Sequence, residues 1–464
     1  MFRKVKKIHF VGIGGIGMSG IAELLLNLDF EISGSDIQDS EIIQNLITKG
    51  AKINTDGHKA DNVGDSEVLV YSSAVRENNP EILRAKDRGI PVIRRAEMLG
   101  ELIAVKETSI AVSGTHGKTS TSSMIGSVLN AADYDPTLVV GGLVKTLGTN
   151  SLLGLGDIII VEADEFDRSF LALRPTISVV TNIELEHTDC YANIEELQKA
   201  FIQFCNSVPF YGEIIVCIDS PGVREIVADI YRPITTYGIS TQADYRAENV
   251  QFKNNSITYS AYFLHKQLGQ IKLNVPGQYN VLNSLSAIAV GMEMEIPFNI
   301  IKKGLIEYEG VRRRFEIKGI VNDIMVVDDY AHHPTEVAAT LDAARTGWSR
   351  RIVAVFQPHL YTRTRDFYRE FAESFLNSDI LIVTDIYPAR EDKIISIDGN
   401  LVSKAAMELG HKNVHYIPNL DDLNQKLDEL TRPGDMVIGI GAGTVWRYIE
   451  NYIKHLEKTD IKNS

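Results

Sequence analysis

Short runs of β-branched and apolar residues alternate with helical patterns almost throughout the chain. Residues 7–12, 108–112 and 351–356 are examples of these runs, and a stretch with helical periodicity follows each of them. Parallel strands need such helices between them, because the chain must return to the same end of the sheet before each new strand begins. The alternation therefore predicts an α/β protein built mainly from parallel sheets.

The chain has 464 residues, which is enough for about three domains of roughly 150 residues each. We expect a Rossmann-like domain over residues 1–106, a central P-loop domain with a mainly parallel sheet over 107–310, and a second Rossmann-like domain over 311–464. Within the central section, residues 246–263 change to strict alternation around an Asn-Asn turn. This change predicts a local antiparallel hairpin.

Charge and cysteine content exclude several classes of protein. The chain carries 47 basic and 61 acidic residues, a net charge of −14, without a long basic run, which argues against binding to nucleic acid or to an anionic membrane. Cys190, Cys205 and Cys217 show no disulfide or metal spacing and are expected to be free thiols. Glycines follow the basic N-terminal residues where a signal peptide needs an apolar segment, and no apolar run approaches about 18 residues. We expect a cytoplasmic protein, either a monomer or a homodimer.

A first glycine-rich loop follows the first predicted strand and opens the first predicted helix. Its glycines are Gly12, Gly14, Gly15 and Gly17, and Asp36 lies 19 residues beyond the last of them. This is the context of a Rossmann dinucleotide site. A glycine turn at a helix N-terminus holds any diphosphate, so NAD, a nucleotide-sugar and a merely tight turn remain alternatives. We favour a diphosphate ligand other than NAD.

A second glycine-rich loop, Val-Ser-Gly-Thr-His-Gly-Lys-Thr-Ser over residues 112–120, lies between an apolar run and a helical pattern. Backbone N–H groups of such a loop wrap the phosphates of a nucleotide, with Lys118 reaching the outer phosphates and the Thr119 hydroxyl a Mg²⁺ ion. The standard pattern places its first glycine at position 112, which here is valine, and Gly114 stands four residues before Lys118. The loop predicts a protein that uses ATP or GTP together with Mg²⁺.

Acidic side chains follow the neighbouring predicted strands of the central domain. Glu162 comes directly after the apolar run 157–161 and is our candidate for a direct Mg²⁺ ligand. Asp164 and Glu165 are either further ligands or solvated loop acids. His187 ends the segment after the next strand, near where the phosphate loop must lie, which favours a functional over a structural role.

The third section contains a dense polar cluster, Asp-Asp-Tyr-Ala-His-His-Pro-Thr over residues 328–335, where a predicted strand ends and a helix begins. Helix capping in a solvated loop is its structural explanation, and a binding site at the carboxyl edge of the sheet is the functional one. Arginines at 312–314, 363 and 365 supply cations to an otherwise acidic chain. Their places at a domain joint and after a strand suit the neutralisation of phosphate in transfer.

Taken in order, these motifs resemble those of the Mur ligases of bacterial cell-wall synthesis. The motifs are Gly-Ile-Gly-Gly-Ile-Gly-Met, Gly-Thr-His-Gly-Lys-Thr, Glu-Ala-Asp-Glu, Asn-Ile-Glu-Leu-Glu-His, Asn280-Val-Leu-Asn283, Arg-Arg-Phe-Glu and Asp-Asp-Tyr-Ala-His-His-Pro-Thr. The resemblance extends from about residue 7 to the final helix. In having histidine at position 116, the phosphate loop resembles that of two branches of the family. One attaches L-alanine to a sugar nucleotide, and the other attaches a recycled tripeptide to the same sugar nucleotide.

The resemblance implies ADP-forming amide synthesis in peptidoglycan precursor production, a process required for cell shape and cell division. ATP phosphorylates the lactyl carboxylate of UDP-N-acetylmuramate, and the amine of L-alanine attacks the resulting acyl phosphate. The first domain then binds the UDP-sugar, the second hydrolyses ATP, and the third closes to bring in the amino acid. Mg²⁺ is the implied metal, and the implied partners are these small molecules alone.

The resemblance also implies roles for individual residues. The implied UDP-sugar ligands are Gly12, Gly14, Gly15, Gly17, Asp36, Ser72, Ser73 and Arg95. The implied ATP ligands are Gly114, Thr115, His116, Gly117, Lys118, Thr119, Ser120, Asn280, Asn283, Arg313 and Asp328, with the two asparagines on the adenine side. The implied metal ligands are Thr119, Glu162 and His187, the implied alanine ligands are Tyr330, His332 and Arg363, and the implied catalytic residues are Lys118, Glu162, His187, His332 and Arg363.

One departure from the family pattern leaves a choice open. Some members carry arginine directly after the Pro-His of the third-domain loop, and this chain has Leu360 there. The arginine that binds the carboxylate of the amino acid is then Arg363, with Arg365 as an additional candidate.

Two other classes of protein explain the motifs less well. An NAD-dependent oxidoreductase would leave the Lys118 loop and Glu162 without a role, and a nucleotide-gated switch would need no polar cluster in the third domain.

Overall fold

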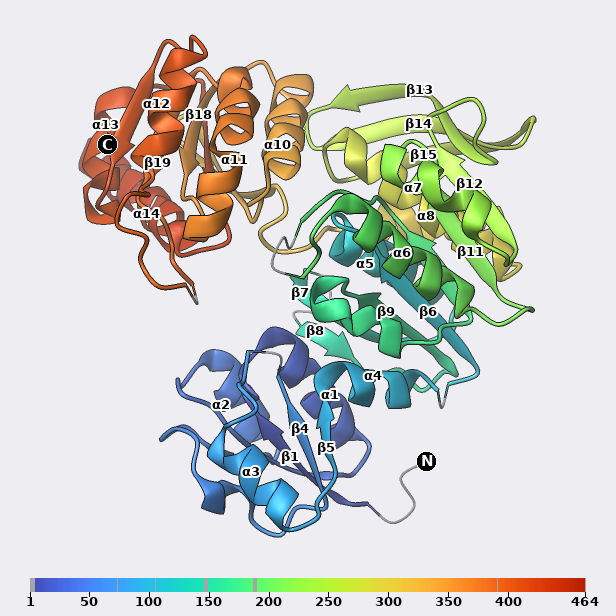
Figure 1. Cartoon of the computed structure of the whole chain (residues 1–464). Helices are drawn as coiled ribbons and strands as arrows, with labels where there is room; N and C mark the ends of the chain where they lie inside the picture. The colour runs from blue at the N-terminus through green and yellow to red at the C-terminus, as the bar shows by residue number, and fades with distance from the viewer. Residues whose placement is uncertain are drawn as a thin grey trace. The chain divides into compact units, whose positions relative to one another are not determined.

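The computed structural model describes residues 5–72, 74–104, 106–145, 149–186, 190–389 and 391–463. Its strands form three sheets of five, ten and six strands, each accompanied by helices (Figure 1). Most neighbouring strands are parallel, which confirms the predicted α/β class. Among the described helices, none combines the length and the apolar character needed to cross a bilayer. Each sheet falls within one of the three predicted domains, whose exact boundaries stay predictions.

The first sheet is fully parallel, in the order β3-β2-β1-β4-β5. The strand order reverses at β1, so the loop that follows β1 lies at the point where α/β sheets open a crevice for ligands. The elements are β1 (Lys7–Val11), α1 (Ile16–Asn27), β2 (Glu31–Ser35), α2 (Glu41–Thr48), β3 (Lys52–Asn54), η1 (Ala60–Val63), β4 (Val68–Tyr71), α3 (Pro80–Asp87), β5 (Val92–Arg94) and α4 (Arg95–Ile103).

The central sheet has the order β15-β14-β13-β12-β11-β10-β6-β9-β7-β8. Its first half contains β6 (Thr108–Ser113), α5 (Lys118–Ala131), β7 (Thr137–Val144), β8 (Thr149–Leu152), β9 (Ile158–Ala163), η2 (Phe166–Ala172), β10 (Ile177–Val180), α6 (Ile194–Asn206) and β11 (Glu213–Cys217). It continues with α7 (Pro221–Ile226), η3 (Val227–Asp229), β12 (Ile234–Gly238), β13 (Tyr245–Lys253), β14 (Ser256–Phe263), β15 (Lys266–Leu273), α8 (Gln278–Glu293) and α9 (Phe298–Glu307). Strand β6 lies between β10 and β9, so the two strands followed by predicted acidic residues flank the phosphate loop.

The predicted hairpin at 246–263 is present as β13 and β14, which are neighbours joined by Asn254 and Asn255. Asn254 has φ +52°, a value that asparagine tolerates better than most residues. Strand β15, which extends the hairpin, and the antiparallel pair β7 and β8 were not predicted from the sequence. β15 and β8 are the two edge strands of the sheet, where one neighbour is missing, and β7 lies between β8 and β9.

The third sheet has the order β16-β17-β21-β18-β19-β20, with β16 antiparallel and the other pairs parallel. Its elements are β16 (Glu316–Val321), β17 (Ile324–Asp329), α10 (Pro334–Gly347), β18 (Arg351–Phe356), α11 (Tyr361–Ser374), η4 (Phe375–Asn377), β19 (Ile380–Thr384), α12 (Asn400–Glu408), β20 (Val414–Ile417), η5 (Leu420–Asp422), α13 (Leu423–Leu430), β21 (Asp435–Ile440) and α14 (Val445–Asn463). β17 and β18 lie on either side of β21 and run parallel to it, so the loops after β17 and β18 lie at the same carboxyl edge of the sheet.

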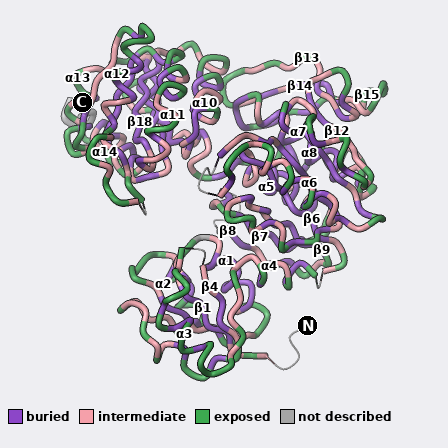
Figure 2. The backbone as a smooth tube through the Cα atoms, viewed as in Figure 1, coloured by how far each residue is buried: buried purple, intermediate pink, exposed green. Residues whose placement is uncertain are grey.

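The four inner strands of the third sheet, β17, β21, β18 and β19, are buried on both faces, as their continuous apolar runs predict. Met325 and Val327 of β17 pack into one hydrophobic cluster, while Ile324 and Val326 pack into another. Successive side chains of a strand point to opposite faces, so the sheet separates the two clusters. Figure 2 shows the buried interior along the strands and the exposed residues on the outer helices and loops.

The chain packs into two compact units. One unit holds the first domain and most of the central domain, and the other holds the third domain together with segments 251–258 and 273–280.

Candidate active site

The loop between β6 and α5 has the backbone shape that its glycines predict. Gly114 has φ +131°, and a Cβ atom there would lie 2.1 Å from Oγ1 of Thr181. Gly117 has φ +85° and is the N-cap of α5, which has neither a side-chain cap nor an acidic residue in its first turn. L side chains rarely adopt these φ values, so both positions favour glycine. The N-terminus of α5 therefore presents backbone N–H groups suited to an anion.

The segment after β10 holds this loop in place. The His116 N–H donates to Oδ1 of Asn182 at 2.8 Å, and the Thr115 N–H donates to the Asn182 carbonyl at 3.1 Å. The Thr181 hydroxyl donates to the His116 carbonyl at 2.6 Å. The N–H of Glu184 donates to the Thr115 hydroxyl at 2.9 Å. Two neighbouring strands are thus linked at their carboxyl ends, where the sequence places the site.

Lys118, the first residue of α5, is 15% exposed and points back into the loop. Its Nζ donates to the carbonyls of Gly114 at 2.7 Å and Thr115 at 3.3 Å. It also donates to Oε2 of Glu165 at 2.7 Å and lies 3.7 Å from Oδ1 of Asp164. Both acids lie around the lysine; burial excludes the solvated-loop alternative for Glu165, whereas the side chain of Asp164 is 41% exposed. A role of either acid as a metal ligand stays a prediction.

Charge pairing keeps the Lys118 amine protonated. Burial alone would lower its pKa, but the negative charges of Glu165 and Asp164 outweigh burial and raise the pKa above its ordinary value. Burial raises the pKa of the Glu165 carboxyl to about 7, against the opposing charge of Lys118. Glu165 is 1% exposed, and its Oε1 accepts no hydrogen bond within the described part of the chain.

Glu162 lies beside the phosphate loop, and its role as a metal ligand stays a prediction. It pairs in register with Val112 of β6 and approaches Thr119, whose hydrogen bond lowers the pKa of its carboxyl. Burial is the larger effect and raises that pKa overall. Oε2 would lie 2.9 Å from a Cβ at Gly141, while the buried Oε1 has no hydrogen-bond partner in the described ranges. A carboxylate oxygen without a donor, beside a threonine hydroxyl, fits a hard divalent cation.

His187 lies outside the described residues, so its predicted metal role stays a prediction. Thr181 and Asn182 both contact the phosphate loop, and neither was predicted as a site residue from the sequence. The signal that could have found them is their position directly after β10, the strand beside β6.

Asn283 lies against the phosphate loop. Its Oδ1 accepts a hydrogen bond from the Thr121 hydroxyl at 3.1 Å and would lie 3.0 Å from a Cβ at Gly117. Asn280 belongs to the other compact unit, and its Nδ2 donates to the Pro276 carbonyl at 2.7 Å. Ser120 is buried in the first turn of α5. The predicted role of the two asparagines on the adenine side stays a prediction.

In the first domain, the end of β2 shapes the glycine loop. The Ser35 carbonyl accepts from the N–H groups of Gly12 at 2.9 Å and Ile13 at 3.1 Å. Oδ2 of Asp36 accepts from the Gly14 N–H at 2.8 Å. Asp36 thus orders the loop, a role different from the ribose contact that acidic residues make at this position in dinucleotide sites. Gly15 is the N-cap of α1, again without a side-chain cap.

Arg95 adds a cation beside this loop. Its Nη1 would lie 2.7 Å from a Cβ at Gly17, so the missing side chain leaves room for the guanidinium. Arg95 also lines a cavity of about 130 Å³ together with Asp167 and Arg168, both of which have φ +55°. Ser72 lies beside Gly12, with its Cβ 3.4 Å from where a Cβ of Gly12 would be. Ser73 lies outside the described residues.

In the second compact unit, Arg313 ties the end of β17 to the loop after β21. Its Nε lies 3.3 Å from Oδ2 of Asp328, and its Nη2 donates to the Gly441 carbonyl at 2.6 Å. The guanidinium stacks over the rings of Tyr330 and Trp446. Burial raises the pKa of the fully buried Asp328 carboxyl to about 7, against the charge of Arg313.

The predicted alanine-binding residues come from two loops of the same sheet. Nδ1 of His332 lies 3.1 Å from the Tyr330 carbonyl and 3.1 Å from Oε2 of Glu336. The ring of His332 lies 6.0 Å from that of His359, in the loop that leads to Arg363. The structure therefore brings the loop of Tyr330 and His332 next to the loop that precedes α11.

Comparison with known proteins covers each of the three sheets. The model for the catalytic domain of the Mur ligase family matches residues 7–107, the Mur ligase middle domain matches 112–291, and the Mur ligase glutamate ligase domain matches 313–443. A curated relative from Salinibacter ruber, named UDP-N-acetylmuramate–L-alanine ligase, is 49% identical over 98% of this chain and 96% of its own length.

Solved structures show the same architecture. The crystal structure of the UDP-N-acetylmuramate-alanine ligase from Thermotoga maritima has a TM-score of 0.83 and 27% identity, covering 98% of this chain and 99% of that chain. A murein peptide ligase from Psychrobacter arcticus has a TM-score of 0.70 and 23% identity, covering 97% and 98%, and shares the fold.

Proposed function

The chain belongs to the Mur ligase family, and we propose that it joins L-alanine to UDP-N-acetylmuramate while converting ATP to ADP and phosphate. The observation that carries the proposal is the surroundings of Lys118. A protonated amine, an uncapped helix N-terminus and a carboxylate oxygen without a donor on Glu162 converge at one loop. This combination suits the binding of a nucleoside triphosphate together with a divalent cation.

The proposed reaction has two steps. A lactyl carboxylate oxygen attacks the γ-phosphorus of ATP, the bond to the ADP oxygen breaks, and an acyl phosphate forms. The neutral amine of L-alanine then attacks the acyl carbon, phosphate leaves, and the nitrogen loses a proton to give the amide. The first step brings two anions together, so its barrier falls when fixed positive charge faces both of them.

The residues of the central domain supply that charge. Lys118 would neutralise the transferring phosphoryl group, since its amine is protonated and held at the start of α5. Thr119 and Glu162 would hold Mg²⁺, and the family resemblance adds His187 as a further ligand. When bound, the ion would offset charge on the phosphate oxygens. Glu165 would keep the Lys118 amine oriented until the nucleotide arrives.

The remaining sites divide by domain. We assign the diphosphate of the UDP-sugar to the loop of Gly12, Gly14, Gly15 and Gly17 with Asp36, Ser72, Ser73 and Arg95. We assign further ATP contacts to Asn280, Asn283, Arg313 and Asp328, and the amino acid to Tyr330, His332 and Arg363. We also propose that the protein is cytoplasmic and is a monomer or a homodimer. The proposal includes no binding to nucleic acid or to membranes.

The test is phosphate release with UDP-N-acetylmuramate, ATP and Mg²⁺ against a panel of amino acids. We expect release to require both the UDP-sugar and L-alanine, and mass spectrometry to find the alanyl product. Equal release with the tripeptide L-alanyl-γ-D-glutamyl-meso-diaminopimelate would favour the recycling branch instead. Release without any amine acceptor would contradict the ligase assignment.

A further inference from the structure

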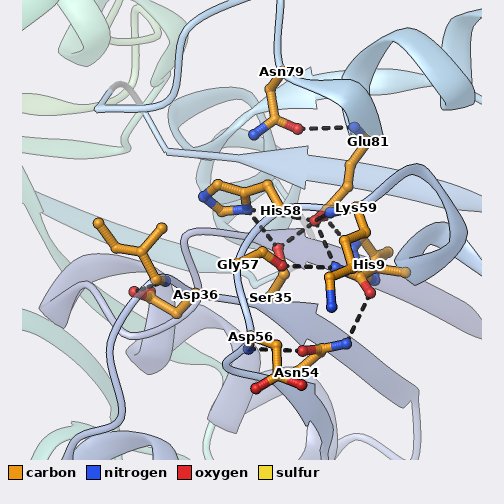
Figure 3. A network of polar contacts seen from close by, with 12 residues as sticks. His9, Ser35, Asp36, Asn54, Asp56, Gly57, His58, Lys59, Asn79 and Glu81 are labelled. Carbon is orange, nitrogen blue, oxygen red and sulfur yellow. Dashed lines mark hydrogen bonds and ion pairs between the residues drawn. The ribbon is translucent and has the colours of Figure 1, made fainter.

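Glu81 is a buried carboxylate in the first domain with a hydrogen bond on every side. It is 0% exposed. Oε2 accepts from Nε2 of His9 and from the Ser35 hydroxyl, each at 2.8 Å. Oε1 accepts from Nδ2 of Asn62 at 2.8 Å and from the backbone N–H of Lys59 at 3.1 Å. Figure 3 shows His9, Ser35 and Lys59 gathered around the carboxylate.

The surroundings favour the charged form of Glu81. Burial alone would raise the pKa of its carboxyl, but the hydrogen bonds from His9, Asn62 and Ser35 outweigh burial and hold the pKa below its ordinary value. His58 lies at the edge of the group, with Nδ1 2.9 Å from the Ser35 hydroxyl and 3.4 Å from Oε1 of Glu81.

The partners of Glu81 sit where the glycine loop is anchored. His9 is in β1, three residues before Gly12, and Ser35 is the last residue of β2. The Ser35 carbonyl is the acceptor for the N–H groups of Gly12 and Ile13. The Glu81 carboxylate therefore bonds both to β1, the strand that leads into the loop, and to Ser35 of β2, whose carbonyl accepts from the loop backbone.

We propose that Glu81 is a positioning residue for the diphosphate subsite: through His9 and Ser35 it holds the backbone of residues 12–15 in the shape that binds the UDP-sugar. The inference rests on the proposed function, which assigns that loop to the diphosphate. A buried charge is not needed for stability alone, since well-packed apolar residues often replace buried ionic groups without loss. Precise placement of the glycine loop would be a reason for the protein to keep this buried charge.

The first test is Glu81→Gln, which preserves shape but turns an amide N–H₂ toward groups that donate to Glu81. We expect KM for UDP-N-acetylmuramate and the dissociation constant for UDP alone to rise about tenfold. The KM values for ATP and L-alanine and kcat at saturation should stay within about twofold, because the substitution alters none of the residues assigned to ATP or to the amino acid. UDP is the chosen probe because it carries the diphosphate without the sugar or the lactyl group.

The second test uses a matched pair on β2. Ser35→Ala removes the link between Glu81 and the loop, and we expect it to raise the UDP dissociation constant about threefold to tenfold. Ser33→Ala removes a hydroxyl that contacts Nδ1 of His9 at 2.9 Å but leaves the Ser35 link between Glu81 and the loop in place, so it should weaken UDP binding less than Ser35→Ala does. Ser35→Thr keeps the hydroxyl and should restore affinity.

The outcomes are separable. A Glu81→Gln protein that melts earlier but binds UDP normally would overturn the inference and leave Glu81 a structural residue. If that variant does not fold, Ser35→Ala decides, and unchanged UDP affinity there would overturn the inference as well. If the unaltered protein binds neither UDP nor UDP-N-acetylmuramate, the proposed function fails before the role of Glu81 is reached.

Discussion

Nζ of Lys118 lies 2.7 Å from Oε2 of Glu165, so the lysine of the phosphate loop has an acidic partner within its own domain. The pair is mostly buried, which makes an uncompensated charge costly if either partner is removed. Glu165 follows β9, and Lys118 begins the helix after β6, the strand beside β9. The neighbouring strands therefore deliver both charges to one point.

Replacing Lys118 with alanine should reduce kcat/KM by about a thousandfold, as expected when a main source of positive charge at a transferring phosphoryl group is lost. The dissociation constant for UDP-N-acetylmuramate should not change, since the UDP-sugar is assigned to the first domain. Initial-rate kinetics and titration calorimetry measure the two quantities. Lys199→Ala, at an exposed position of α6, is the matched control. Activity retained in Lys118→Ala would remove the phosphate-loop assignment.

Glu162→Gln should raise the Mg²⁺ concentration that gives half-maximal activity by tenfold or more. The substitution keeps the size of the side chain but removes the negative charge next to Thr119 that attracts the cation. A magnesium titration of the rate measures the effect, with the exposed Glu195→Gln as control. An unchanged titration would mean that the carboxylate is not a metal ligand. His187→Ala tests the same site by the same titration.

Gly114→Ala should abolish ATP binding and destabilise the central domain. The added methyl group would lie 2.1 Å from Oγ1 of Thr181 and 3.0 Å from the backbone of Asn182, so the loop must move. We expect a loss of about 1–3 kcal/mol in the free energy of unfolding. Gly57→Ala is the control, because Gly57 also has positive φ, +90°, but nothing lies within 4 Å of the added atom. Normal ATP affinity in Gly114→Ala would contradict the tight fit around the loop.

Asp328→Asn should change how stability depends on pH. The unfolded carboxyl titrates near 3.8 and the folded one near 7, so between these values the folded state binds more protons than the unfolded state. The free energy of unfolding of the parent therefore falls as pH rises through this window, by at most about 4 kcal/mol from this group. The variant lacks this loss, so its thermal midpoint relative to the parent should be higher at pH 8 than at pH 5. The exposed Asp392→Asn should show no such change, and equal differences at both pH values would contradict the raised pKa.

Local sequence signals predicted the loops and the strands around them. Gly117 and Lys118 are recognisable because a helix N-terminus that binds phosphate needs their backbone and charge at fixed spacing. The position of Glu162 beside the loop was predictable because a parallel strand delivers the residues at its carboxyl end to the same edge as the loop. The family resemblance, confirmed by the domain matches, then joined these sites into one reaction.

Contacts between distant segments could not be predicted. Glu81 bonds to His9, which is 72 residues away, and no periodicity in the sequence relates the two. The same holds for Thr121 and Asn283, which are 162 residues apart. Such pairs depend on strand order, which sequence patterns define only as a class. Edge strands such as β16 were missed because their residues are only partly buried and alternate weakly.

The choice between Arg363 and Arg365 for the carboxylate of the amino acid can now be argued from the structure. Arg365 is 52% exposed, and its Nε lies 2.7 Å from Oδ1 of the adjacent Asp366, so its charge is already compensated. Arg363 lies in the first turn of α11, next to the loop whose His359 faces His332. Arg363→Lys should therefore raise KM for L-alanine at least tenfold, because lysine cannot make the bidentate contact of a guanidinium with a carboxylate. Arg365→Lys should change it less than twofold. Amino-acid titrations at saturating ATP and UDP-N-acetylmuramate measure both values, and the reverse order of effects would assign the carboxylate to Arg365.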